Sequence, residues 1–170
     1  MNKIRFRHHF RAVPFLLGIT FLSVVFAGMT GFDPFAVKVF SVFMFVMVVP
    51  CIFIHIEYLR ANAGFEFEIN NTGIQVTRGG KVVRVVDTGD IKNIAIYKSP
   101  NLRYRFVHLA SEYYYYARIT MHDSSADIII TSLVTNEDFD ELSPLWQVKT
   151  ETKKTLFPSI RFPVVLPALN

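Results

Sequence analysis

Cysteine is almost absent from this chain of 170 residues, which carries a single one, Cys51. A lone cysteine cannot form an intramolecular disulfide, so the sequence gives no argument for an oxidising compartment. Cys51 stands inside an apolar stretch, and we interpret it as a small packing residue of a helix.

The usual signatures of catalysis and cofactor binding are also missing. The sequence has no glycine-rich dinucleotide turn, no zinc-ligand spacing and no nucleophile placed with a base. His8 and His9 are adjacent, so they do not face each other on a helix, and no third ligand stands near them. Arg78-Gly79-Gly80-Lys81 lacks the spacing of a phosphate-binding loop. We predict no catalytic residue, no metal and no cofactor, and therefore not an enzyme.

Acidic residues are scarce only in the first part of the chain. Residues 1–60 hold six Lys and Arg but two acids, whereas residues 61–170 hold twelve of each. The basic excess is thus confined to the N-terminal part, and no cationic domain remains for a nucleic-acid backbone. We expect no nucleic-acid partner.

Two long apolar runs occupy this N-terminal part. They cover Ala12–Phe32 (21 residues) and Pro34–Ile56 (23 residues), and Asp33 separates them. About 20 apolar residues suffice for a helix to cross a bilayer. The sequence predicts a transmembrane hairpin in residues 1–60, with helices at about 12–32 and 35–57. A cleaved signal peptide ending near Ala27 is the alternative for the first run.

Basic residues before the first run set the expected orientation. Lys3, Arg5, Arg7 and Arg11 precede it without an acid, which favours a cytoplasmic N-terminus. A hairpin then returns the chain to the cytoplasm, so both termini should lie there. His55, Tyr58 and Arg60 are expected to anchor the end of the second helix at the membrane interface.

Alternation of apolar and polar residues predicts a β-domain over residues 61–148. The strands are expected at 65–70, 74–77, 82–86, 91–97, 112–121 and 127–131, with a less regular extended piece at 103–109. Apolar residues at helical spacing then predict a C-terminal helix at about 136–147. Residues 149–170 form an apolar tail with three prolines, which exclude a third spanning helix. The tail could dock in extended form, lie at the membrane or be disordered.

The chain resembles the membrane-anchored bacterial pleckstrin-homology-like (bacterial PH) domain proteins. The likeness lies in FEFEINNTGIQVTRGGKVVRVVDTGDIKNIAIY (65–97) and ADIIITSLVTNEDFDELSPLW (126–146), together with the apolar hairpin. The resemblance implies two near-orthogonal antiparallel sheets capped by one C-terminal helix, no catalytic residues, and a location in the bacterial inner (plasma) membrane.

Candidate binding residues fall in two groups. On the strand 112–121, Tyr114, Tyr116 and Arg118 alternate with the expected core residues, and these residue types are enriched where proteins bind each other. They could instead form a ladder with a neighbouring strand. Phosphoinositide-binding PH domains carry cations in the first hairpin loop, which here has none. Arg78, Lys81 and Arg84 follow one turn later and are weaker candidates for lipid-headgroup contact.

The sequence therefore predicts a membrane-anchored cytoplasmic binding or scaffolding module with a PH-like domain that mediates protein–protein interaction or assembly. The expected partners are membrane lipids, a protein of unknown identity and, as a further option, a second copy of the chain. Two alternatives stay open: a peripheral domain that senses anionic lipid, and an accessory subunit of a membrane enzyme or transporter.

Overall fold

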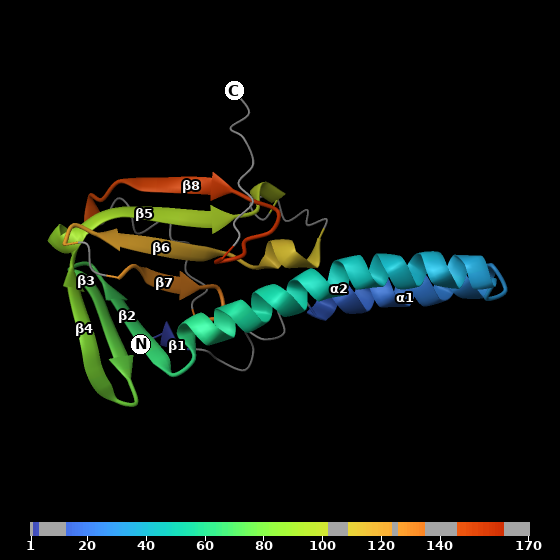
Figure 1. Ribbon diagram of the computed structural model, residues 1–170, viewed down its shortest axis with the longest axis horizontal. Coiled ribbons are helices and arrows are strands. Elements are labelled where there is room, and N and C mark those ends of the chain that lie inside the picture. The colour runs from blue at the N-terminus through green and yellow to red at the C-terminus, as the bar shows by residue number, and fades with distance from the viewer. Residues whose placement is uncertain (1, 4–12, 102–108, 124–125, 135–145, 162–170) are drawn as a thin grey trace, which may run out of the picture.

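A computed structural model describes residues 2–3, 13–101, 109–123, 126–134 and 146–161 of the chain. In these residues two N-terminal helices precede a mainly-β domain of two sheets (Figure 1). The predicted C-terminal helix at about 136–147 and the extended piece at 103–109 fall almost entirely outside the described residues.

Helices α1 (Val13–Met29) and α2 (Pro34–Asn62) form a hairpin that projects from one end of the molecule (Figure 1). The turn is fixed by Asp33, whose carboxylate accepts the backbone N–H groups of Phe35 and Ala36 at 3.0 Å. Pro34 follows at the first helical position, where its missing N–H costs nothing. The rings of Phe26 and Phe40 lie 5.1 Å apart and join the two helices.

Among the described residues, α2 alone is long and apolar enough to cross a membrane, by length and composition. Only 11% of its most apolar window is buried in the molecule, unlike the core helix of a soluble protein. The shorter apolar helix from Leu16 to Met29 falls below that length. The second helix was expected to end near residue 57, but it continues for more than one further turn to Asn62.

The first sheet contains β1 (Asn2–Lys3), β2 (Phe65–Asn70), β3 (Gly73–Arg78) and β4 (Lys81–Asp87), in that order and all antiparallel. The pairing of β1 with β2 holds this N-terminal segment beside the β-domain. Gly73 begins β3 with φ +153°, and a Cβ there would overlap the carbonyl oxygen of Val86. The β2–β3 turn therefore requires glycine at this position.

The second sheet has the order β7 (Ile128–Thr131), β6 (Tyr116–Met121), β5 (Ile91–Lys98) and β8 (Thr150–Lys154). Its pairs are antiparallel except β5–β8, which is parallel. The sheet is thus not purely antiparallel, because residues expected in a tail supply an extra edge strand. The strand expected at 112–121 begins only at Tyr116, since residues Ala110–Tyr113 form a 3-10 turn, η4.

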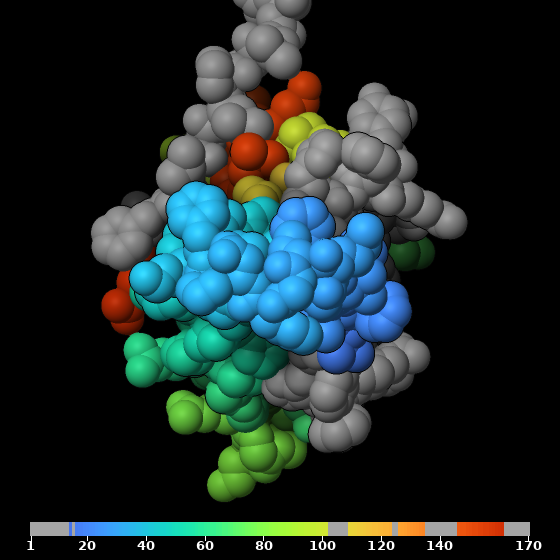
Figure 2. All heavy atoms as spheres, turned by 90° about the vertical axis from the view of Figure 1, so that its right-hand side faces the viewer, coloured from blue at the N-terminus to red at the C-terminus, as the bar shows by residue number. Residues whose placement is uncertain are grey.

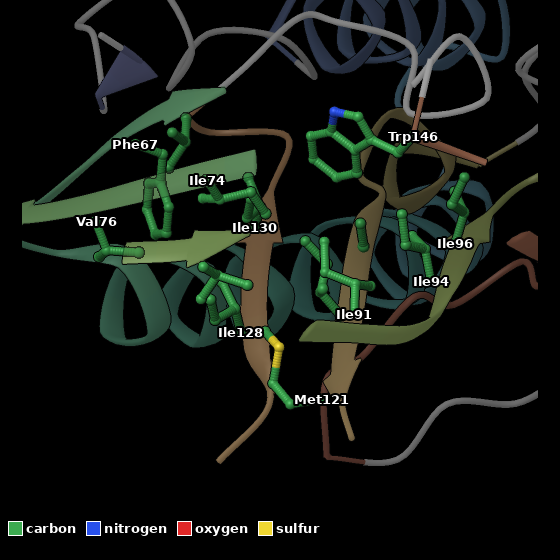
Figure 3. Packing of buried hydrophobic residues seen from close by; sticks show 14 residues of the cluster. Phe67, Ile74, Val76, Ile91, Ile94, Ile96, Met121, Ile128, Ile130 and Trp146 are labelled. Carbon is green, nitrogen blue, oxygen red and sulfur yellow. The ribbon is translucent and has the colours of Figure 1, made fainter. Parts of the chain in front are cut away.

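The main core lies between the two sheets, whose strands run crosswise to each other (Figure 1). Phe67, Ile74 and Val76 of the first sheet meet isoleucines of β5 and β7 there (Figure 3). Trp146 closes this core, and its indole N–H donates to the carbonyl of Asn70 at 2.7 Å. The other face of the second sheet covers a separate cluster against α2, which forms the candidate site described next.

Candidate functional site at the junction of α2 with the β-domain

The end of α2 is built into the β-domain rather than joined to it by a linker. Ile54, Tyr58 and Asn62, spaced four residues apart on one side of the helix, are all fully buried. They contact the face of the second sheet that points away from the main core. We call the contact between α2 from Cys51 to Asn62, this sheet face and residues 155–160 the α2 junction.

Asn62 attaches the last turn of α2 to the edge strand β7. Its side-chain N–H donates to the carbonyl of Ile129 at 2.7 Å, and its side-chain oxygen accepts the N–H of Thr131 at 2.9 Å. The amide thus supplies the donor and the acceptor that a neighbouring strand would offer. Two backbone groups at the outer edge of β7 are thus hydrogen-bonded to a helix residue instead of to a further strand.

Tyrosine rings fill the middle of the α2 junction. The ring of Tyr58 meets those of Tyr114 and Tyr116 edge to face, with centroids 5.6 and 6.1 Å apart. Tyr116 also stacks on Tyr97, at 4.6 Å. On the helix, His55 Nδ1 and the Tyr114 hydroxyl lie 3.1 Å apart in a hydrogen bond. Such aromatic pairs contribute about 0.5–1.5 kcal/mol each beyond the burial of their area.

The C-terminal segment, which we define as residues 155–160, lies across this cluster and turns tightly at Pro158, where the Ser159 N–H donates to the carbonyl of Phe157 at 2.8 Å. Three side-chain donors hold three successive carbonyls of the segment. Tyr58 donates to Pro158 at 2.8 Å, Tyr116 to Ser159 at 3.3 Å and Arg118 Nη2 to Ile160 at 3.3 Å. These bonds involve the backbone of the segment and do not depend on its side chains.

Glu57 of α2 supplies the matching acceptor. Its Oε2 accepts the hydroxyl of Ser159 at 2.8 Å and the backbone N–H of Ile160 at 3.0 Å. Its Oε1 is buried without a hydrogen-bond partner among the described residues. The stacked rings of Phe53 and Phe157, 6.3 Å apart, extend the contact towards the apolar part of α2. The C-terminal segment is therefore bound to both the helix and the sheet.

Burial controls the protonation of the junction tyrosine on β6. Desolvation raises the pKa of Tyr116 well above its usual range, and Tyr97 and Glu57 add to the rise, while Arg118 opposes it. The hydroxyl thus stays protonated at neutral pH and serves as a donor to Ser159. An acid–base role at that pH does not fit such a group.

The expectation that Tyr114, Tyr116 and Arg118 form an exposed binding face is wrong on exposure. Tyr114 is 4% exposed and Tyr116 is fully buried, and Arg118 is half-buried. The alternation itself was correct, because Ala117, Ile119 and Met121 point into the main core as expected. The opposite face is covered by α2 and the C-terminal segment. Tyr116 and Arg118 do bind a peptide backbone, but it belongs to the same chain.

The cations proposed for lipid contact lie elsewhere. Arg78 and Lys81 are exposed, and the guanidinium of Arg78 lies over the ring of Phe65, 5.1 Å from its centroid. Arg84 is half-buried and donates to the carbonyl of Ala126 at 2.7 Å. Strands β3 and β4 lie at the end of the molecule opposite the tip of the α1–α2 hairpin (Figure 1). A membrane entered by this hairpin would therefore be remote from these cations.

Sequence reasoning missed Glu57, Asn62 and Ser159 as junction residues, and it placed Tyr58 at a membrane interface. One signal was present in the sequence. Ile54, Tyr58 and Asn62 are spaced four residues apart, and this spacing continues past the predicted end of the helix near residue 57. Among the described residues, no three side chains of His, Cys, Asp or Glu gather where they could hold a metal ion. The hydrogen bonds and ring contacts of the α2 junction fix the helix, the sheet and the C-terminal segment in place.

A β-domain of two crossed sheets with an apolar helix docked on it fits the class of PH-like folds. A family model described as a PH domain matches residues 2–140. The chain therefore belongs to the PH domain family, whose members are generally non-catalytic binding modules. Searches of the curated proteins and of the solved structures returned no match.

Proposed function

We propose that this protein is a membrane-anchored cytoplasmic PH module that holds a binding surface in a fixed orientation over the bilayer. One observation carries the proposal: α2 runs without a break from an exposed apolar part into the α2 junction. A module that only needed tethering would be joined by a flexible linker. Here a single helix is both the anchor and a structural part of the domain.

The apolar part of the hairpin supports membrane insertion. Large apolar side chains along both helices are exposed, among them Met29 (81%), Phe35 (75%) and Phe45 (66%). Soluble proteins rarely expose so continuous an apolar surface, and a bilayer would cover it. Since α1 pairs with α2 along its length (Figure 1), we propose that both helices enter the membrane.

Orientation follows from the ends of the hairpin. The pairing of β1 with β2 places residues 2–3 on the same side of the hairpin as the β-domain. The basic residues at positions 3, 5, 7 and 11 favour the cytoplasm for that side. We therefore propose an inner-membrane protein with the N-terminus and the β-domain both cytoplasmic.

Topology and extraction test this proposal together. Reporter fusions placed after Asp33 and after Asn170 should report opposite sides of the membrane, with the Asn170 fusion inside. The full chain should stay in the membrane fraction after alkaline carbonate treatment. Release by carbonate would contradict the anchor, and an external signal from the Asn170 fusion would contradict the orientation. A fusion inserted at Gly89, in the β4–β5 connection, serves as a second internal control.

Fixed orientation needs a separate measurement. Spin labels on the exposed positions Ile52 of α2 and Lys92 of β5 should give one narrow distance distribution in vesicles, once Cys51 is replaced by serine. The α2 junction predicts this result because it leaves no hinge between the two elements. A broad distribution would mean a tethered, mobile domain and would remove the main support for a scaffolding role.

A further inference from the structure

The strand β4 has an unusual outer surface for the edge of a sheet. In the first sheet, outward-facing residues of the inner strands are polar, namely Glu66 and Glu68 of β2 and Gln75 of β3. The edge strand reverses this trend. Its residues Val82, Val83 and Val85 are 54%, 54% and 62% exposed.

Edge strands of soluble monomers normally carry charges where these valines stand, because an apolar edge pairs with other chains. Strand β4 pairs with β3 on one side only, and its other side has no strand beside it among the described residues. The bulge opposite Val76 and Thr77 leaves Val83 without a partner on β3. The edge therefore presents exposed aliphatic side chains on a strand that pairs on one side only among the described residues.

The charges at the two ends of β4 point to one kind of partner. Lys81 begins the strand and Asp87 ends it, and both are exposed. Two copies of β4 that pair in antiparallel fashion around Arg84 bring Lys81 of each copy opposite Asp87 of the other. In the same register Val83 faces Val85. The central Arg84 is directed towards the carbonyl of Ala126, and so away from this contact.

We propose that β4 is the docking surface for a second copy of this chain, through antiparallel β4–β4 pairing with Lys81 opposite Asp87. In Figure 1 the strands of the first sheet follow in the order β2, β3 and β4 away from the hairpin, so the free edge of β4 faces away from the tip of the hairpin.

Part of the β3–β4 region is also visible beside the hairpin. In Figure 2, which looks along the hairpin from its tip, light-green atoms of the β3–β4 region project at the lower margin of the molecule, and the hairpin helices do not lie over them.

Cysteine cross-linking tests the pairing and its register. With Cys51 replaced by serine, the chain has no other cysteine. Chains with Val83→Cys are mixed with differently tagged chains carrying Val85→Cys and oxidised, in detergent and in reconstituted vesicles. Directly opposed residues lie within disulfide reach, whereas diagonal ones are about 7–8 Å apart, so the mixed dimer should form at least about fivefold faster than either self-dimer.

A matched control and a charge exchange complete the test. Glu68 is also exposed but lies on an inner strand, so Glu68→Cys should give no cross-link. Lys81→Asp should reduce the mixed cross-link, and adding Asp87→Lys should restore it, because the two charges are exchanged in both copies. The proposal would be overturned by any of three results. These are equal cross-linking yields in all mixtures, yields no higher than for Glu68→Cys, and no recovery of the cross-link after the second charge change. The detergent arm tests the pairing even if the chain is not anchored in a membrane.

Discussion

Glu57 on helix α2 accepts the backbone N–H of Ile160, a residue 103 positions further along the chain, in a hydrogen bond of 3.0 Å. The same carboxylate oxygen also accepts the hydroxyl of Ser159. A side chain of α2 thus binds the C-terminal segment directly. This contact links the helix to residues that follow the last strand of the β-domain.

Replacement of Glu57 should loosen the α2 junction. Glu57→Ala removes the carboxylate that accepts the Ile160 N–H and the Ser159 hydroxyl, and loss of a buried hydrogen-bond partner costs about 1–3 kcal/mol. Glu57→Gln keeps an oxygen for both donors and should lose less. We expect this order in thermal unfolding of the full chain in detergent, together with faster proteolysis near residue 160 for the alanine variant.

The matched control is Glu68→Ala, which removes an exposed carboxylate from β2 and should leave stability within error of the wild type. Equal losses for Glu57→Ala and Glu57→Gln would show that the acceptor role of this side chain is not the source of the stability. Full resistance of both variants to proteolysis would contradict the attachment of the C-terminal segment to α2.

Tyr116 gives a prediction that depends on pH. At neutral pH, Tyr116→Phe should cost about 0.5–1.5 kcal/mol, since it removes the hydrogen bond to Ser159. The pKa of Tyr116 is raised in the folded state. Its contribution to stability is therefore complete below the unfolded pKa, about 10, and is lost as the pH rises from there towards the folded value.

Thermal unfolding in detergent at about pH 8 and about pH 11 measures this difference. The difference in stability between wild type and Tyr116→Phe should become smaller or change sign at the higher pH. Tyr97→Phe is the control, because that ring stacks on Tyr116 but has no hydrogen bond through its hydroxyl among the described contacts. A constant gap at both pH values would mean that Tyr116 does not stay protonated in the folded protein.

Much of the fold could be predicted from local patterns. Strands β2 to β5 and β7 follow from alternation and from turns such as Gly79-Gly80, because these signals depend on neighbouring residues alone. The beginning of α2 follows from Asp33 and Pro34 in the same way. The core face of β6 was predictable for the same reason. Its start at Tyr116 was not, since no local pattern indicates the 3-10 turn η4 before it.

The α2 junction was not predictable because each of its contacts joins distant parts of the chain. Alternation identified Tyr114 and Tyr116 as one face of a strand, but no local signal shows that a helix covers that face. Residues 150–154 are mostly polar and charged, so nothing in their pattern indicates a strand paired in parallel with β5. Residues 155–160 bind mainly through their backbone, which leaves little trace in the sequence.

Asn62 should be needed for attachment of α2 to β7. Asn62→Ala removes both partners of the strand edge and leaves the Thr131 N–H and the Ile129 carbonyl unpaired. We expect a loss of about 2–4 kcal/mol, from the buried Thr131 N–H and the part-buried Ile129 carbonyl at roughly 1–3 kcal/mol each, reduced by local rearrangement. Alanine favours helix formation, so such a loss cannot come from the helix itself. Denaturant unfolding in mild detergent measures it.

Arg60→Ala is the control for that change, because Arg60 lies in the same turn of α2 and is exposed. Its effect on stability should stay below about 0.5 kcal/mol. Amide hydrogen exchange adds a local measurement: Thr131 should lose protection in Asn62→Ala and keep it in Arg60→Ala. Unchanged protection at Thr131 in both variants would contradict the hydrogen bond between this amide and the Asn62 side chain.

Gly73 should tolerate no side chain. A Cβ at this position would overlap the carbonyl oxygen of Val86, which belongs to the backbone of β4 and cannot turn away as a side chain would. The pairing of Gly73 with Asp87 at the end of β4 would be forced apart. Gly73→Ala should therefore destabilise the β-domain by more than about 2 kcal/mol, beyond the usual cost of a surface substitution. Gly89→Ala is the matched change, because nothing lies within 4 Å of a Cβ there. Thermal unfolding of the two variants in one detergent should separate them clearly, and similar stabilities would show that β4 does not approach Gly73 so closely.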